Sequence, residues 1–194
     1  MLVDRSGWLQ PETHEPGVVR TPTERTSPLQ GKEPLGIVHH TTDDPPTDSY
    51  AYTLAKAWEN KPTGEQRSAS CHLIVAPRGV IYQIAPFTVG TWHTRRGGEI
   101  GGKTVERINH NSIGVEWVNG GRLKYVDGVW RCWDYATARR DVGDPRLAVQ
   151  AASAIPRLPE FAKLPVPTTG TWCAFTVAQE ETCFVLLRAL KDYY

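Results

Sequence analysis

The sequence predicts an α/β domain in which helices pack on a mixed central sheet. Short apolar runs typical of buried strands occur at 35–40, 71–85 and 112–118, and amphipathic helical patterns occur at 48–60 and 176–192. Strands and helices therefore interleave along the chain. With 194 residues, 40% of them hydrophobic, the chain is long enough for one domain with a full core.

The first 33 residues show no regular pattern in the sequence. Residues 1–33 contain four prolines among polar residues and show no period of 2 or 3.6, which predicts an irregular arm laid over the surface. A single domain is expected over 34–194. The apolar run LGIVHH predicts its first core strand, and the polar stretch TTDDPPTD ends that strand.

The next elements are a helix, a hairpin and a strand. A helix is expected over 48–60, because apolar residues recur at i, i+4, i+7 and i+8 from Tyr50, and Thr47 or Asp48 can cap it. The runs CHLIVA and VIYQIA, joined through PRG, predict a hairpin. SIGVEWV predicts the strand that follows, after a loop over 86–111 of a length that is usually functional.

The last third predicts a second hairpin and two helices. The run RLKYVDGVWRCW has a DG turn between two alternating segments, which favours a hairpin. Asp144-Pro145 predicts the start of a short helix that Pro156 ends. The capping box TVAQ at 176–179 begins a final helix that runs to about residue 192.

Composition excludes several classes of partner. The formal net charge is +1, with 22 Lys and Arg against 21 Asp and Glu and no long basic run, so no nucleic-acid partner is expected. No stretch approaches the roughly 18 consecutive apolar residues of a membrane helix, and no signal peptide is visible, so no membrane partner is expected and the protein is expected to be cytoplasmic as synthesised. The four cysteines have no CxxC spacing, which predicts free, mostly buried thiols.

Two adjacent histidines end the first predicted strand, and imidazole is a common zinc ligand. Because neighbouring residues on a strand point to opposite faces, at most one of His39 and His40 can enter a given metal site. The other would make a supporting hydrogen bond or pack on a helix, and a purely structural role is the alternative for either. The HExxH signature of helical zinc hydrolases is absent from the sequence.

An acid lies on the strand SIGVEWV. Glu116 shares a strand face with Gly114 and Val118, so it sits where side-chain bulk has been removed, as the floor of a cleft requires. A carboxylate whose pKa is raised by burial could take a proton from water and pass it to a leaving amine. A solvated glutamate on an open sheet face is the alternative.

The runs TWHTRR and INHNS contain many side chains that donate hydrogen bonds, together with the aromatic side chain of Trp92. Arginine forks match carboxylates, so this pattern predicts an amide-rich, carboxylate-bearing ligand, with a solvated polar loop as the alternative. The residues concerned are Trp92, His93, Arg95, Arg96, Asn109, His110 and Asn111.

Four segments of the chain, taken in order, resemble the type 2 N-acetylmuramoyl-L-alanine amidase family, which includes phage endolysins and peptidoglycan recognition proteins. The segments are GIVHHTT, SASCHLIVAPRGVIYQIAP, GTWHT and NHNSIGVEWVNGG. The segment TWCAFTVAQEETCFVLLRALKDYY is similar to the helix near the end of that family. The resemblance covers 34–118 and 171–193, and 119–170 looks like a subfamily insertion. It implies an amidase-like α/β fold with an inserted hairpin and helix.

The resemblance also implies a peptidoglycan hydrolase. Such an enzyme cleaves the amide between the lactyl group of N-acetylmuramic acid and L-alanine of the stem peptide, with zinc as its cofactor and peptidoglycan or muropeptide as its substrate. It implies His39 as a zinc ligand and Glu116 as the general base, whereas Cys71 stands where some branches have a catalytic tyrosine. The residues expected to bind substrate, from the resemblance and from the donor pattern, are Trp92, His93, Arg95, Asn109 and Asn111.

The sequence shows no counterpart of the family's C-terminal tail, which carries a further histidine and an Asp or Cys as zinc ligands. One hypothesis is an amidase that is either a truncated product or one part of a split site, whose missing zinc ligands a second copy or a separate chain would supply. Another is a zinc-free, catalytically inactive module that binds muropeptide. A third is a rearranged site made of His39, His93 and His110. A phage or prophage lysis product, a delivered wall-active effector and a cytoplasmic recycling enzyme all fit a chain without a secretion signal.

Overall fold

The structure is a computed structural model of the 194-residue chain. It describes residues 1–12, 17–31, 33–44, 46–59, 69–94, 97–126, 129–132, 148–150 and 171–194.

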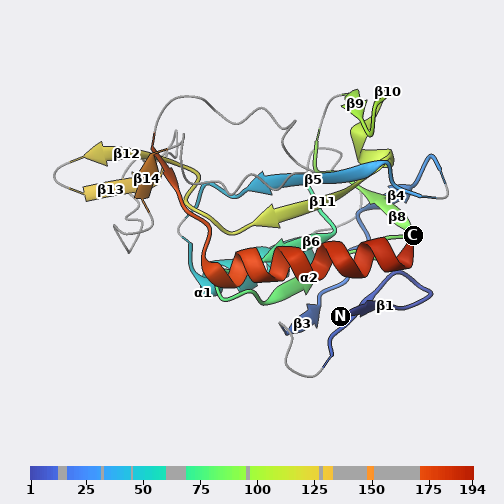
Figure 1. Ribbon diagram of the computed structural model, residues 1–194, viewed down its shortest axis with the longest axis horizontal. Coiled ribbons are helices and arrows are strands. Elements are labelled where there is room, and N and C mark those ends of the chain that lie inside the picture. The colour runs from blue at the N-terminus through green and yellow to red at the C-terminus, as the bar shows by residue number, and fades with distance from the viewer. Residues whose placement is uncertain are drawn as a thin grey trace.

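A mixed five-stranded sheet forms the centre of the fold, in the order β3-β7-β6-β11-β5 (Figure 1). The hairpin strands β6 and β7 are antiparallel, and each of the other neighbouring pairs is parallel. This confirms the predicted mixed sheet and α/β class. The five strands are β3 (Val18–Arg20), β5 (Gly36–Thr41), β6 (Leu73–Val75), β7 (Ile81–Gln83) and β11 (Ser112–Trp117).

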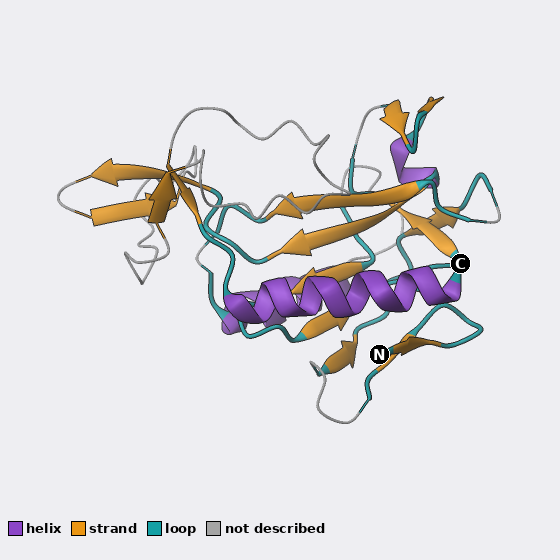
Figure 2. Cartoon of the chain, in the orientation of Figure 1, coloured by secondary structure: helices purple, strands orange, loops and turns teal. Residues whose placement is uncertain are grey.

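The two predicted long helices form where expected and cover opposite faces of the sheet (Figure 2). Helix α1 (Asp48–Glu59) packs Ala51 and Ala55 against a cluster that includes Ile74. Helix α2 (Val177–Tyr193) packs against the other face of the sheet. Successive side chains of a strand point to opposite faces, so α2 contacts the strand residues that alternate with those facing α1. None of the described helices is long and apolar enough to cross a membrane.

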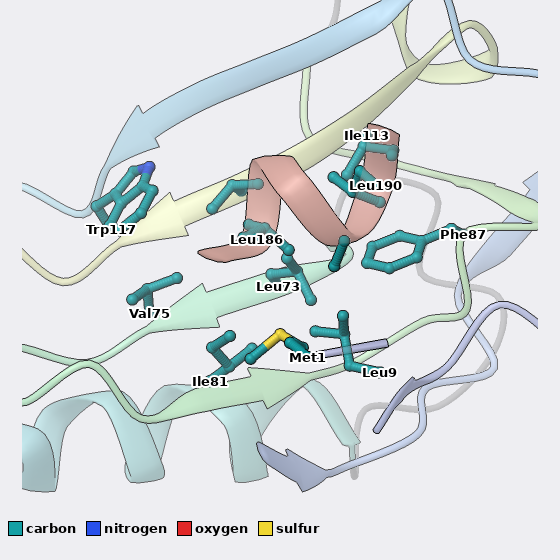
Figure 3. Close-up of a cluster of buried hydrophobic side chains, with 12 residues drawn as sticks. Met1, Leu9, Leu73, Val75, Ile81, Phe87, Ile113, Trp117, Leu186 and Leu190 are labelled. Atoms are coloured by element: carbon teal, nitrogen blue, oxygen red, sulfur yellow. The ribbon is translucent and has the colours of Figure 1, made fainter. Parts of the chain in front are cut away.

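The α2 face holds the larger core cluster, which Figure 3 shows. Leu186 has no exposed surface and lies among side chains from β6, β7 and β11. Residues of alternate positions along β11 enter this cluster, whereas Val118 and Ile74 belong to the α1 cluster. The members contributed by β11 are Ile113, Val115 and Trp117.

The start of α2 is tied to the ends of two central strands. The predicted capping box forms, with Thr176 Oγ1 accepting from Gln179 N and Gln179 Oε1 accepting from Thr176 N. Gln179 is 1% exposed, and its Nε2 donates to Val118 O at 3.0 Å and Val75 O at 3.3 Å. One side chain therefore caps the helix and satisfies carbonyls at the carboxyl ends of β11 and β6.

The remaining elements are short. The hairpin between β6 and β7 turns through Gly79, whose φ of +84° suits glycine. A separate sheet, in the order β13-β12-β15-β14, lies beyond the carboxyl ends of β5 and β11 (Figure 1). These elements are β1 (Leu2–Val3), β2 (Leu9–Gln10), β4 (Thr26–Pro28), β8 (Val89–Thr91), β9 (Gly98–Ile100), β10 (Lys103–Val105), η1 (Ile108–His110), β12 (Arg122–Val126), β13 (Val129–Cys132), β14 (Ala148–Gln150) and β15 (Thr171–Cys173).

The expectation of an irregular arm over 1–33 needs correction. Strand β3 extends the central sheet beside β7, and β4 pairs with β8. Leu9 is 1% exposed and its backbone N–H donates to Gln83 Oε1, so the arm also contributes to the core. These strands are two or three residues long, too short to show a period, and they form because pairing with the sheet satisfies their backbone groups.

The segment 119–170 matches its prediction only in part. The hairpin of β12 and β13 is confirmed, although its DG turn lies outside the described residues. The helix expected between Asp144 and Pro156 is wrong at Ala148–Gln150, which form β14 and pair antiparallel with β15. Pairing with a neighbouring strand overrides the local helix signal there.

The buried position of Leu186 yields a stability prediction. Leu186→Ala removes a fully buried side chain from the α2 cluster and is expected to lower the free energy of unfolding by about 2–5 kcal/mol. Phe184→Ala is the matched control, since Phe184 is 54% exposed on the same helix and should change it by about 0.5 kcal/mol or less. Urea unfolding measures both, and equal losses would contradict the placement of α2.

Candidate functional site

The parallel pairing of β5 with β11 places a histidine opposite an acid. His40 is the register partner of Glu116, so their side chains leave the sheet on the same face, which is the face that α1 covers elsewhere. Both residues are the last but one of their strands, and Figure 1 shows that these strands run in the same direction. Ligands of α/β sheets bind outside the carboxyl ends of parallel strands, so this edge is the candidate site.

His39 lies on the opposite face. Its Nδ1 accepts from Trp117 Nε1 at 2.9 Å, and the two rings stack with centroids 5.8 Å apart. Trp117 belongs to the α2 cluster, as Figure 3 shows. The structure therefore brings Glu116 together with His40 and does not bring it together with His39, because adjacent residues of a strand point to opposite sides.

A chain of hydrogen bonds runs from His40 into the protein. Its Nε2 lies 3.2 Å from His93 Nδ1, and His93 Nε2 lies 3.1 Å from Ser112 Oγ. Ser112 Oγ in turn donates to Ile108 O at 2.7 Å. His93 is 9% exposed and Ser112 is fully buried, so these bonds form away from water.

Gly114 makes room for His93. A Cβ atom at position 114 would lie 2.4 Å from His93 Cγ, a separation that packed atoms do not reach. The sequence predicted that missing bulk beside Glu116 opens a cleft floor. The structure shows that the ring of His93 fills this space instead.

A second buried histidine, His72, lies next to the site and forms hydrogen bonds that fix the neighbouring strands. His72 Nδ1 accepts from Gly114 N at 3.0 Å and pairs with Thr91 Oγ1 at 3.1 Å, and its Nε2 donates to Val89 O at 2.8 Å. With no exposed surface, His72 links β8 to β11 next to His93. Sequence reasoning missed it, although a polar residue at the start of the buried run CHLIVA was a usable signal.

Burial shifts the pKa of the ionisable groups at the site. It raises the pKa of Glu116 to about 8, and the Asp43 carboxylate adds to that effect. Burial lowers the pKa of His93 to about 3, with smaller contributions from the His72 and His40 rings, and it also lowers the pKa of His40. The imidazoles are therefore neutral at neutral pH, while the Glu116 carboxyl holds its proton in most of the population.

The residues expected to bind substrate have different environments. Trp92 is 41% exposed and meets the His110 ring edge-on at 5.6 Å. Asn109 is 6% exposed, and its Oδ1 accepts from His93 N and Thr94 N, so it positions the loop. Asn111 Nδ2 donates to Gln30 Oε1 and Arg107 O. Arg95 and Arg96 lie outside the described residues.

The fit of this site to zinc is partial. Within the described ranges, no three His, Cys, Asp or Glu side chains come together as a metal would require. The rearranged site of His39, His93 and His110 is not formed, because His39 faces α2 and His93 uses both ring nitrogens in hydrogen bonds. His40 fits one ligand position, because its pKa is lowered and its Nδ1 has no hydrogen-bond partner in the part of the chain that the structure describes.

Comparisons with known proteins agree with the resemblance. A family profile described as N-acetylmuramoyl-L-alanine amidase matches residues 30–194. No match was found among curated proteins.

Three solved structures are similar to this chain. A selenomethionine derivative of AmpD has a TM-score of 0.42 and 24% identity, covering 66% of this chain and 72% of that one. Citrobacter freundii AmpD in solution has a TM-score of 0.45 and 19% identity, covering 100% and 77%. AmiD from E. coli, in complex with the substrate anhydro-N-acetylmuramic acid-L-Ala-D-γ-Glu-L-Lys, has a TM-score of 0.35 and 20% identity, covering 71% and 46%.

The family profile spans the central strands β5, β6, β7 and β11 and both helices, including the edge where His40 meets Glu116. The chain is a member of the type 2 N-acetylmuramoyl-L-alanine amidase family.

Proposed function

We propose that this amidase hydrolyses the bond between the lactyl group of N-acetylmuramic acid and L-alanine of the stem peptide, with zinc as cofactor, at the edge where His40 meets Glu116. The observation that carries the proposal is the register of β5 and β11, which sets a neutral imidazole beside a carboxyl of raised pKa. Neighbouring strands are about 4.8 Å apart, so both side chains can reach one reacting centre.

His40, rather than His39, is the proposed zinc ligand on this chain. A ligating histidine must be neutral, and its second nitrogen usually donates to a fixed acceptor. His40 meets both conditions through its lowered pKa and its contact with His93. His39 instead has its Nδ1 engaged by Trp117 on the far side of the sheet. Bound zinc would polarise the scissile carbonyl and lower the pKa of a water molecule.

Glu116 is the proposed general base. A base works best when its pKa is close to the pH at which the enzyme acts, because it must both take and release a proton. With a pKa of about 8, Glu116 is ionised in a minor part of the population at neutral pH, and this ionised form can accept a proton from the attacking water and return it to the departing alanine amine. Its partly exposed position at the strand end leaves it open to water.

The proposed substrate surface includes Trp92. Its indole is 41% exposed and its backbone N–H is held by Ser70 Oγ, so an aromatic face is presented next to His93. Such a face suits the apolar side of a sugar ring or a peptide. Asn109 supports this surface by bonding the loop backbone.

A muropeptide-binding module without turnover is the second candidate. The observation that favours it is that the described residues supply one fitting zinc ligand, whereas a catalytic zinc takes three from protein. Stoichiometric zinc by elemental analysis supports the enzyme. Binding of muropeptide by calorimetry, without zinc and without release of L-alanine amino termini, supports the module.

The choice of histidine yields the first functional prediction. His40→Ala is expected to lower bound zinc and to reduce the release of L-alanine amino termini from purified peptidoglycan by at least about a hundredfold. His39→Ala is the matched control, because it changes the neighbouring residue on the other face and should keep its zinc. Circular dichroism checks that both variants fold. Loss of zinc in His39→Ala alone would make His39 the ligand.

The role of Glu116 yields a second prediction. Glu116→Gln is expected to lower the rate of amide hydrolysis by about 10²–10⁴-fold while muropeptide still binds, because the amide cannot accept the proton. Activity equal to that of the unmodified chain would exclude Glu116 as the base. Glu99→Gln, an exposed acid on β9, should leave the rate unchanged.

The raised pKa of Glu116 yields a third prediction, on stability. Between an ordinary value of 4.5 and the folded value of about 8, the unfolded chain has released a proton that the folded chain keeps. The stability that Glu116 contributes is therefore fully present below pH 4.5, and it is lost as the pH rises from 4.5 through about 8. Relative to the unmodified chain, Glu116→Gln should be equally stable near pH 4.5 and more stable toward pH 8, by at most about 1.4 kcal/mol per pH unit.

Urea unfolding with a chelator present measures this difference at several pH values between those limits. Chelation matters because a bound cation beside the carboxylate would favour its charged form. A constant difference between the two proteins across the range would contradict the raised pKa.

A further inference from the structure

We propose that a cavity between β1 and the last turns of α2 is a second binding site, which takes a dipeptide that carries both a free amino group and a free carboxylate. Binding at this cavity requires neither zinc nor hydrolysis. The site therefore goes beyond the proposed function and does not rest on it.

The size of the cavity limits its ligand. Its volume is about 310 Å³, close to the lower limit of small-ligand pockets, so one or two amino acids fit and a long peptide does not. Part of its wall is apolar and another part is charged. The lining residues are Leu2, Val3, Arg5, Ala189, Asp192 and Tyr193.

The cavity lies at the end of α2 that is remote from the candidate active site. The start of α2 is tied to the carboxyl ends of β6 and β11, because Gln179 donates to Val75 O and Val118 O. Asp192 follows Gln179 by 13 residues, which is about 20 Å along a helix. Figure 1 shows the C-terminal end of α2 beside β1, away from the arrowheads of β5 and β11. A ligand in the cavity leaves the active edge open.

The cavity presents one positive and one negative side chain. Arg5 and Asp192 both line it, yet no ion pair among the described residues includes either of them. The planar guanidinium of Arg5 matches a carboxylate. Asp192 lies in the last turn of α2, where the free carbonyls of a helix also attract a cation. A ligand with a carboxylate toward Arg5 and an ammonium toward Asp192 therefore complements both charges.

Arg5 is carried by a fixed turn. Asp4 Oδ1 accepts from the backbone N–H groups of Ser6 and Trp8, each at 3.0 Å, and from the Ser6 hydroxyl at 2.6 Å. The bond from the Ser6 hydroxyl, followed by that from Trp8 N–H, lowers the pKa of Asp4 to about 2. The turn therefore keeps these bonds at neutral pH, which reduces the entropy that binding would cost.

The apolar wall is an extension of the core. Val3 and Tyr193 pack against the α2 cluster, which includes Ala189. The Tyr193 ring meets the Tyr194 ring edge-on at 4.8 Å, and the Tyr194 hydroxyl donates to Phe87 O at 3.0 Å. This wall is held from behind, and it suits small apolar side chains such as the methyl groups of alanine.

The primary test follows backbone amide signals by NMR while L-alanyl-L-alanine is added to the unmodified chain. Saturable shifts are expected at residues 2–5 and 189–193, with a dissociation constant on the order of 1 mM, because so small a ligand makes few contacts. The N-acetylated dipeptide lacks the amino group and the dipeptide amide lacks the carboxylate. Each should bind about 3–10-fold more weakly than the free dipeptide.

Two variants assign the charges of the ligand. Arg5→Gln should no longer distinguish the free dipeptide from its amide, whereas it should still disfavour the N-acetylated form. Asp192→Asn should show the converse pattern. Arg188→Gln and Glu181→Gln are the matched controls, because both residues are exposed on α2 and lie outside the cavity, and they should bind like the unmodified chain. Circular dichroism checks that all variants fold.

Either of two results would overturn this assignment. One is the absence of saturable shifts at residues 2–5 and 189–193 with the free dipeptide. The other is a preference among the three ligands that stays the same in Arg5→Gln and Asp192→Asn. Glu116→Gln should bind the dipeptide like the unmodified chain, since Glu116 lies outside the cavity. Loss of dipeptide binding in that variant would place the ligand at the active edge instead.

Discussion

The parallel pairing between β5 and β11 is the constraint on which the site depends. Its register sets Glu116 beside His40 and sets His39 beside Trp117 on the opposite face, and a shift of one residue would reverse both outcomes. The register is secured because Ile113 and Val115 must be buried under α2. Hydrophobic packing on one face of the sheet therefore determines which polar groups meet on the other face.

Burial of polar groups beneath the site is stabilised by complete hydrogen bonding. His72 bonds to β8 and β11, and Gln179 joins the cap of α2 to the carbonyls that end β6 and β11. Each unsatisfied buried group would cost about 1–3 kcal/mol, so such side chains favour one arrangement of the strands over its competitors. The strand ends that carry His40 and Glu116 are held in place by these polar anchors as well as by apolar packing.

The same surroundings give the site its chemical character. Low solvent access keeps the imidazoles neutral and the carboxyl weakly acidic, which suits metal ligation by one and proton transfer by the other. Neutral rings can also form a directional chain of hydrogen bonds, whereas two charged rings at 3.2 Å would repel. The edge of the sheet where these groups meet lies within residues 30–194, which the amidase family profile matches.

The sequence by itself determined the α/β class, both long helices, the hairpins and the family, because these follow from periodicity, caps and motifs read along the chain. It also singled out Glu116, His93 and Trp92. Only the tertiary structure decided that β3 joins the sheet, that His72 and Asn109 are buried supports, and that His40 rather than His39 faces Glu116. Local patterns cannot contain these facts, because strand pairing and the choice of buried face are set by contacts between residues far apart in the chain.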